Sequence, residues 1–277
     1  MEYEIIYVVK CFNDSVNINT IIDNINIFNT YNNIFIIINT SYEYYNTNCL
    51  SDIETKNKHI HFIQSKKTKS KFSCLCGLHL YNSMNYIIDN KFQYQYICCF
   101  NDSERFVRQF KVKDIKLKKY EVNVKTPISN KWYWKTNLLK YKEFLIFCDQ
   151  YKITPIASQY NGLLFDNTTV NDILPYLMKI EKDNILNTDI ELPIDEILYP
   201  SLIHFTNNTY TNICKIIWDK NYNINNEFNS ILDDKCDTYY SIKFSQINNV
   251  NEYNKIIYDL QNHEKIAQKD LVPLVNN

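Results

Sequence analysis

The chain has 277 residues, of which 45% are apolar and 22% charged, a composition typical of a folded globular protein with a sizeable core. Its formal net charge of -1 gives no support to a general nucleic-acid binder, which normally carries a basic excess. The only two glycines, Gly77 and Gly162, exclude the glycine-rich phosphate loops of P-loop, Rossmann dinucleotide-binding and kinase folds.

The sequence also carries signals about the compartment. No apolar run reaches membrane-spanning length, and the first residues, MEYEIIYVVK, lack the basic start and cleavage site of a signal peptide. Nine cysteines without framework spacing favour reduced, buried thiols. We therefore expect a soluble, cytoplasmic protein with no membrane span. The sequence does not indicate its oligomeric state.

Strand-like and helix-like segments alternate through the first hundred residues. Apolar, β-branched runs predict strands buried on both faces at 4–10, 33–39, 59–64 and 94–100. Apolar residues at helical spacing predict helices over 16–28 and 71–89. This repetition predicts an α/β fold with a parallel sheet, in which ligands bind at the carboxyl ends of the strands.

The second half of the chain has a different pattern. An exposed, lysine-edged ribbon is predicted at 111–125, and a strand at 238–245. Helices are predicted at 130–150, 168–182, 194–206 and 250–268. Because no repeat, linker or boundary interrupts the chain, we expect one α/β domain over 1–277 with an elaborated C-terminal half.

Two carboxylates follow the fourth predicted strand, in FNDSERF. Asp102 and Glu104 form an Asp-x-Glu turn, and alternate carboxylates of this kind suit a divalent cation held against a diphosphate. The alternative is a polar turn in which Arg105 and Arg108 pair with the acids. The sequence leaves both interpretations open.

Aromatic and basic residues form two further candidate features. The segment KWYWK presents Trp132 and Trp134 between lysines, a pattern that suits stacking on sugar rings or, alternatively, anchoring a helix in the core. Lys243 lies inside an apolar strand and therefore needs an anionic partner or a route to water. A diphosphate and a surface carboxylate are the two alternatives for that partner.

The segment LPIDEILYPSLIHF, residues 192–205, places Asp195 and Glu196 at the start of a predicted helix. Its apolar residues share one helical face, and Glu196 lies nearly opposite them, toward solvent or a cleft. We expect Asp195 to cap and orient the start of the helix. Pro200 predicts an interruption or a kink around Tyr199.

Together these features resemble GT-A-fold glycosyltransferases, and in places the core-2/I-branching N-acetylglucosaminyltransferases. The stretch KSKFSCLCGLHLYNSMNYI followed by FQYQYICCFNDSERF resembles the helix and strand before that family's central acidic loop. PIASQYNGLLFDNTTVNDIL resembles its Gly-Ser-Gln-aromatic block, with Ala157 in place of the glycine. LPIDEILYPSLI resembles its Pro-Asp-Glu motif, with Ile194 inserted, and TYYSIKFSQINN resembles its C-terminal basic segment. The similarity is spread over about residues 3–265.

The resemblance implies a fold and a set of site residues. The fold is a GT-A-like (Rossmann-like), mostly parallel sheet flanked by helices, with a nucleotide-binding half at about 1–110 and an acceptor and catalytic half at about 111–277. Glu196 matches the catalytic base, with Asp195 beside it. The implied donor-binding residues are Cys11, Asn13, Asn39, Ser41, Asp102 and Lys243, and the acceptor-binding residues are Trp132, Trp134, Ser158 and Gln159. Asp102 and Glu104 are the implied ligands of a Mn²⁺ or Mg²⁺ ion, although the core-2 family works without a metal.

The implied function is transfer of a hexosyl or N-acetylhexosaminyl group from a nucleotide sugar, expected to be a UDP-sugar, to a glycan or small acceptor. An inverting transfer needs one carboxylate as general base and positive charge on the leaving diphosphate. Two alternatives stay open. One is a metal-dependent nucleotidyltransferase that uses Asp102 and Glu104, and the other is a non-catalytic carbohydrate-binding or structural protein of the same fold.

Overall fold

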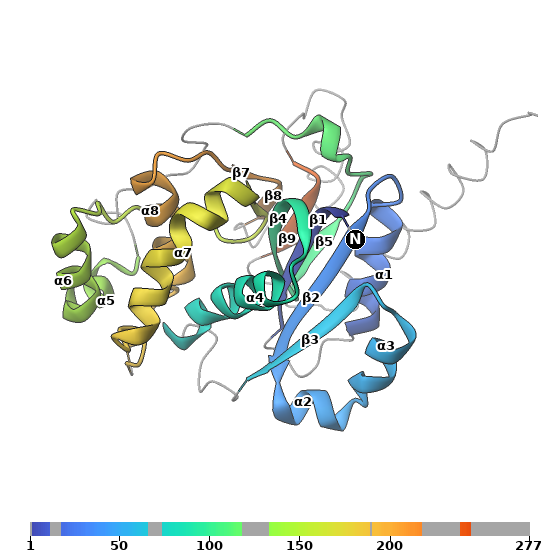
Figure 1. Cartoon of the computed structure of the whole chain (residues 1–277), viewed down its shortest axis with the longest axis horizontal. Coiled ribbons are helices and arrows are strands. Elements are labelled where there is room, and N and C mark those ends of the chain that lie inside the picture. Colours follow the sequence, from blue (N-terminus) through green and yellow to red (C-terminus); the bar gives the residue numbers. More distant parts are fainter. Residues whose placement is uncertain are drawn as a thin grey trace, which may run out of the picture.

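The protein is described by a computed structural model. The structure describes residues 2–11, 18–65, 74–117, 133–188, 190–217 and 239–244. A central six-stranded sheet carries helices on both faces, and a smaller three-stranded sheet lies beside it (Figure 1). The α/β fold class predicted from the sequence is confirmed.

The central sheet has the strand order β3-β2-β1-β4-β6-β7. Its first four strands are parallel: β1 (Glu2–Lys10), β2 (Ile34–Ser41), β3 (Ile60–Ser65) and β4 (Gln93–Asn101). Each overlaps a strand predicted from the sequence, with ends that differ by at most two residues. The other two, β6 (Leu163–Asp166) and β7 (Thr211–Asn212), are antiparallel to their neighbours.

The register of the sheet brings three polar residues into one row. Lys10, the last residue of β1, lies opposite Asn39 of β2 and Asn101 of β4. Because these strands are parallel, the row marks the carboxyl edge of the sheet, where ligands bind in open α/β sheets.

Two sets of helices bury the two faces of the sheet. One face packs against α1 (Ile18–Phe28), α2 (Tyr42–Thr47) and α3 (Leu50–Lys56). The other face packs against η1 (Cys74–Gly77), α4 (Leu78–Asp89), α7 (Asn167–Lys182) and α8 (Asp195–Phe205), with α5 (Lys135–Lys140) and α6 (Lys142–Tyr151) in the same core. Successive side chains of β1 point to opposite faces of the sheet and so contribute to both cores. Ile6 and Val8 belong to the core on the side of α4, and Tyr7 and Val9 to the core on the side of α1.

The smaller sheet has the order β5-β9-β8, formed by β5 (Glu104–Phe106), β9 (Ser241–Phe244) and β8 (Cys214–Ile217). β5 is antiparallel to β9 and follows β4 after a two-residue turn. Its register places Glu104 opposite Lys243. Two charged residues far apart in the sequence therefore lie side by side at the carboxyl edge of the central sheet.

The prediction that Pro200 interrupts its helix is wrong, because α8 runs without a break from Asp195 to Phe205. Proline has no N–H to donate to the carbonyl four residues earlier, which here belongs to Glu196. The backbone N–H of Ser158 donates to that carbonyl instead, at 2.8 Å. The lost intrahelical hydrogen bond is replaced by one from a neighbouring loop.

Other segments of the second half differ in detail from the prediction. The predicted helix at 130–150 consists, in its described part, of α5 and α6 separated at Tyr141. The predicted ribbon at 111–125 is wrong over 111–117, which forms no strand and contains the short 3₁₀ helix η2 (Val112–Asp114). The rest of that ribbon and the predicted helix at 250–268 lie outside the described residues.

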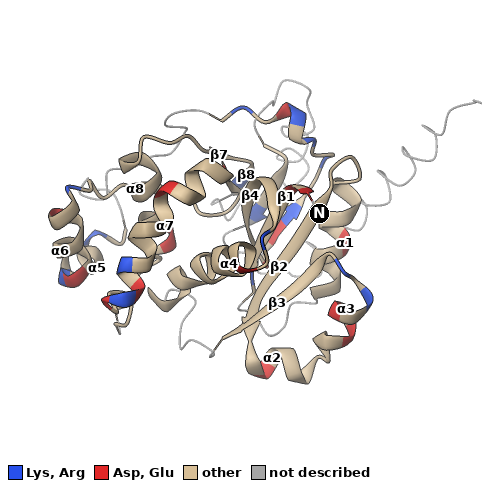
Figure 2. Ribbon diagram, in the orientation of Figure 1, with Lys and Arg blue, Asp and Glu red and all other residues tan. Residues whose placement is uncertain are grey.

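Charge is distributed in small groups over the outer helices. Figure 2 shows acidic and basic residues close together along α3, α6 and α7. Within the part of the chain that the structure describes, no helix is long and apolar enough to cross a membrane.

Candidate functional site

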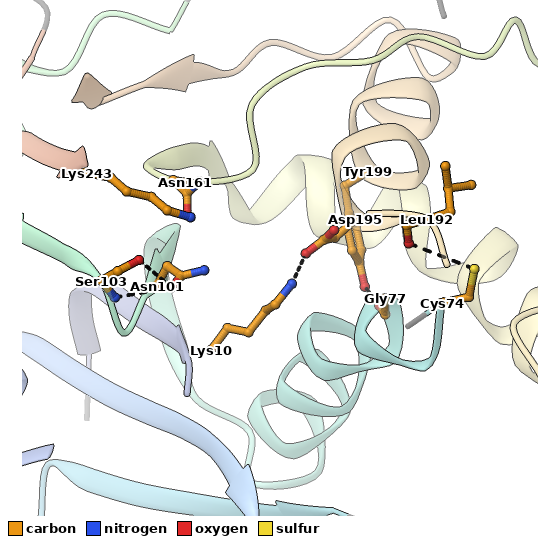
Figure 3. A network of polar contacts seen from close by, with 10 residues as sticks. All are labelled: Lys10, Cys74, Gly77, Asn101, Ser103, Asn161, Leu192, Asp195, Tyr199 and Lys243. Carbon is orange, nitrogen blue, oxygen red and sulfur yellow. Dashed lines mark hydrogen bonds and ion pairs between the residues drawn. The ribbon is translucent and has the colours of Figure 1, made fainter. Parts of the chain in front are cut away.

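A buried ion pair joins the end of the central strand to the start of α8. The Lys10 ammonium at the end of β1 contacts the Asp195 carboxylate in the first turn of the helix (Figure 3). Both residues are buried, with 6% and 3% of their surfaces exposed. Lys10 Nζ also lies 5.3 Å from the centre of the Tyr160 ring. Asp195 therefore pairs with a strand residue, and the prediction that it caps the helix is wrong, since no side chain caps α8.

Glu196, the next residue of α8, is half-buried, whereas Asp195 before it and residues 197–203 after it are buried. Burial raises the pKa of Glu196 to about 7, helped by the negative charge of Asp195 and opposed by Lys243 and Lys10. A carboxylate whose pKa is near neutral suits a general base, because it can accept a proton and still be largely ionised at physiological pH. The structure thus gives Glu196 the property expected of the predicted base.

Lys243 approaches the same region from β9. Its Nζ donates to the Asn161 side-chain oxygen at 3.3 Å (Figure 3). Burial lowers the pKa of Lys243; Lys10 also lowers it, while Glu196 and Asp102 raise it. Two lysines from different strands therefore share one electrostatic environment with the carboxylates of α8 and of the turn after β4. An anion such as a diphosphate would be stabilised there.

His79, in the first turn of α4, is buried beside the ion pair. Burial, with a further contribution from the charge of Lys10, lowers the pKa of His79 to about 3. This histidine is therefore neutral at physiological pH and adds no charge to the site.

The predicted metal pair is divided between two environments. Asp102 lies in the turn after β4, where its backbone N–H donates to the Lys10 carbonyl at 3.0 Å. Glu104 is fully buried in β5, accepts a hydrogen bond from the Ser241 hydroxyl at 2.5 Å, and has its pKa raised to about 8 by burial. A protonated carboxyl is a poor metal ligand. Among the described residues, no group of three or more His, Cys, Asp or Glu could hold a metal ion.

These observations do not fit a Mn²⁺ or Mg²⁺ ion held by Asp102 and Glu104, and we assign no catalytic step to such an ion. The alternative interpretation, in which arginines pair with the two acids, is also wrong. Arg105 donates to the backbone carbonyls of Asp102 and Glu104, at 2.7 and 2.6 Å. Arg108 lies over the Tyr240 ring, 4.2 Å from its centre.

The predicted donor-binding residues at the ends of β1 and β2 occupy distinct positions. Cys11 is buried directly after β1. Asn39 is buried and donates to the Ser83 hydroxyl at 3.0 Å, while its side-chain oxygen has no hydrogen-bond partner among the described residues. Ser41 caps α2 by accepting from the Tyr44 N–H, which is a structural role. Asn13 lies outside the described residues.

The predicted acceptor-binding residues are mostly engaged with the backbone. Besides the bond from Ser158 to Glu196, the Gln159 side chain donates to the carbonyls of Asn161 and Cys214, at 2.8 Å each. Trp134 directly precedes α5 and packs against the larger core. Trp132 lies outside the described residues.

The structure adds two site residues that the sequence had not indicated, Lys10 and Asn161, and places His79 beside Lys10. Only Lys10 had a signal in the sequence, because it is a charged residue that ends an apolar strand of a predicted parallel sheet. The site as a whole combines a half-buried carboxylate with a pKa near neutral, two lysines and two amides at the carboxyl edge of the sheet.

Comparison with known proteins adds little to this geometry. No protein-family model matches the chain, and no curated protein is significantly similar to it. Among solved structures, the chain is similar to the apo form of the glycosyltransferase GlyE of Streptococcus pneumoniae TIGR4, with 11% sequence identity and a TM-score of 0.25. The match covers 86% of this chain and 65% of that chain. A TM-score this low does not establish a common fold, and the activity of GlyE is no evidence for the activity of this protein.

Proposed function

We propose that this protein is a glycosyltransferase that moves a sugar from a nucleotide-sugar donor, expected to be a UDP-sugar, to a glycan or small acceptor. The observation that carries the proposal is the position of Glu196 and its pKa of about 7, beside Lys10 and Lys243 at the carboxyl edge of the sheet. The resemblance of LPIDEILYPSLI to the Pro-Asp-Glu motif supports the same role for Glu196.

The proposed reaction is an in-line displacement with inversion at the anomeric carbon. Glu196 accepts the proton of the acceptor hydroxyl as its oxygen forms a bond to the anomeric carbon. The bond between that carbon and the diphosphate oxygen breaks, and its electron pair leaves with the nucleoside diphosphate. Lys243 stabilises the charge that develops on this leaving group. Proton, electron pair and leaving group are then all accounted for without a metal.

The sheet edge supplies a place for the donor. Cys11 follows the last residue of β1, and Asn39 lies near the end of the neighbouring strand β2. β2 pairs with the edge of β1 that β4 does not occupy. A nucleoside held there would lie at the same edge of the sheet as Lys10, Lys243 and the start of α8.

A metal-dependent nucleotidyltransferase is the weaker candidate. Two-metal chemistry needs ionised carboxylates that share the cations. Glu104 is instead buried, bonded to Ser241 and protonated near neutral pH. A non-catalytic carbohydrate-binding protein would keep the fold but would not need a base in this environment.

A ligand panel tests the proposal. The protein is heated with UDP, other nucleoside diphosphates and their sugar conjugates, each with and without Mn²⁺, and the melting temperature is compared with that of the free protein. A ligand that binds only the native state raises this temperature. We expect stabilisation by at least one nucleotide sugar, followed by transfer or slow donor hydrolysis. If no nucleotide stabilises the protein, the proposal is wrong.

The variant Glu196→Gln then tests the base. We expect transfer to fall by about 10²–10⁴-fold while nucleotide binding is retained, because an amide cannot accept the proton. Glu191→Gln, at an exposed position shortly before α8, is the matched control and should keep full activity. Retained turnover in Glu196→Gln would remove Glu196 from the mechanism.

A further inference from the structure

The ion pair between Lys10 and Asp195 is more than a generic surface contact, because both partners are buried at the edge of the candidate site. Removing two charges from water costs free energy, and a well-packed apolar pair often serves stability equally well. A buried pair next to a half-buried carboxylate therefore raises the question of what the charges do there.

The position of α8 does not depend on this pair alone. The Tyr199 hydroxyl donates to the Gly77 carbonyl and accepts from the Tyr81 N–H at 3.1 Å, which fixes the middle of the helix to η1 and α4. The Ser158 N–H binds the Glu196 carbonyl and fixes the first turn. Because other contacts hold the helix, the ion pair is free to serve the electrostatics of the site.

The pair is directly connected to Glu196. Asp195 precedes it in the same helical turn, so the negative charge that Lys10 holds in place stays beside the neighbouring carboxyl group. The proton affinity of Glu196 responds to three charged side chains: Asp195 on its own helix, Lys10 on β1 and Lys243 on β9. Asp195 favours the protonated form of Glu196, and the two lysines favour the ionised form.

The remaining titratable groups around the pair contribute no charge near neutral pH. The described groups that interact with Asp195 include His79 on α4, Cys74 on η1, Cys99 on β4, Tyr160 and Tyr199. Burial lowers the pKa of His79 and raises the pKa values of the two thiols and the two tyrosines, so all five are neutral. Cys76 also interacts with Lys10, and its thiol is buried.

We propose that Lys10 and Asp195 form a buried charge pair whose position beside Glu196 sets the basicity of Glu196 for the transfer reaction. The inference rests on the proposed function, since basicity matters only if Glu196 is the base. Neither residue touches the reacting atoms. Both act on Glu196 through their charges, Asp195 from the same helical turn and Lys10 from the end of β1.

The test measures the titration of Glu196 itself. The full-length protein is labelled with ¹³C at the glutamate side-chain carboxyl groups, and the Glu196 signal is assigned by its loss in Glu196→Gln. We expect Asp195→Asn to lower the titration midpoint by about one pH unit, because it removes a neighbouring negative charge. Lys10→Met should raise the midpoint, and Lys10→Met with Asp195→Asn should return it toward the wild-type value.

The double variant guards against loss of folding, because it replaces the buried ion pair by two uncharged side chains of similar size. The exposed pair of Asp149 and Lys152, at 3.2 Å, is the matched control, and Asp149→Asn and Lys152→Met should leave the Glu196 midpoint unchanged. If Asp195→Asn and Lys10→Met both titrate as the wild type does, the inference is overturned.

The pH profile of transfer connects the titration to the reaction. The acidic limb should move to lower pH in Asp195→Asn, in step with the NMR midpoint, whereas a structural defect would lower the rate equally at every pH. If the midpoints move but no nucleotide binds, the proposed function is wrong and the electrostatic coupling stands. If transfer occurs but the acidic limb of its pH profile does not shift with the titration midpoint of Glu196, the role of the pair is wrong and the proposed function stands.

Discussion

The backbone N–H of Ser158 donates to the carbonyl of Glu196, the carbonyl that Pro200 leaves without an intrahelical partner. This bond fastens the loop before β6 to the first turn of α8. Asn161, which accepts from Lys243, belongs to the same loop. The proline therefore links the candidate base and the candidate diphosphate-binding lysine through one short segment of backbone.

Pro200→Ala tests this link. The alanine N–H can bond the Glu196 carbonyl and would compete with Ser158 for it. We expect the Ser158 amide to exchange its hydrogen faster in Pro200→Ala than in the wild type, measured by hydrogen exchange under native conditions. Pro175→Ala, at the proline inside α7, is the control and should not change Ser158 exchange. Equal protection of Ser158 in all three proteins would contradict the link.

Lys243 should contribute to binding through the diphosphate alone. A hydrogen bond to a charged group is worth about 1.5–3 kcal/mol, so Lys243→Met should weaken UDP binding by roughly 10–100-fold. Uridine, which lacks phosphates, should bind both proteins equally in the same calorimetric assay. Lys113→Met, at an exposed position of η2, provides the charge-matched control. An equal loss of UDP and uridine affinity would mean that the variant has disturbed the fold.

Much of the central sheet could be predicted because its strands are apolar and β-branched along their whole length. The run NIFIIIN has no polar face, which is the pattern of a strand buried on both sides, and it forms most of β2. The strands of the second half lack this signal. β7 has two residues, Thr211 and Asn212, and exists only because β6 offers an unpaired edge. Such pairings depend on tertiary contacts that no local pattern contains.

The candidate site could be predicted only in part, for the same reason. Helical periodicity placed Glu196 opposite the apolar residues, and Glu196 is indeed less buried than residues 197–203, because that inference uses only neighbouring residues. Lys10 meets Asp195, which lies 185 residues later in the chain, so its role could not be found locally. The Asp102 and Glu104 prediction assumed one extended turn, whereas Glu104 enters β5 and faces Ser241.

The two glycines should differ in their tolerance of alanine. Gly162 has φ of +67°, and an added Cβ would lie 2.5 Å from the backbone nitrogen of Cys214. At Gly77 the added Cβ would lie 2.6 Å from the Cγ2 methyl of Ile194, a side-chain atom rather than a backbone atom, and φ is not in the left-handed region. We expect Gly162→Ala to lower the free energy of unfolding by more than about 2 kcal/mol, and Gly77→Ala by less. Urea denaturation of both variants measures the difference, and the reverse order would contradict this packing.

Glu104 should make the protein less stable as the pH rises. Its pKa in the folded protein, about 8, lies above the usual value of 4.5, so the folded state binds its proton more tightly than the unfolded state does. The stability contributed by this group is fully present below about pH 4.5. It is lost progressively as the pH rises through about 8, because the fully buried side chain must then ionise.

Glu104→Gln removes this dependence while keeping a hydrogen-bonding side chain opposite Ser241. The variant should match the wild type near pH 5 and exceed it at pH 9 by on the order of 1–3 kcal/mol in the free energy of unfolding. Urea denaturation at both pH values measures the difference. Glu43→Gln, at an exposed position of α2, should give the same difference from the wild type at both. If Glu104→Gln were instead less stable than the wild type at pH 9, the folded protein would have to favour the ionised form of Glu104, and the metal-binding role of Asp102 and Glu104 would become plausible again.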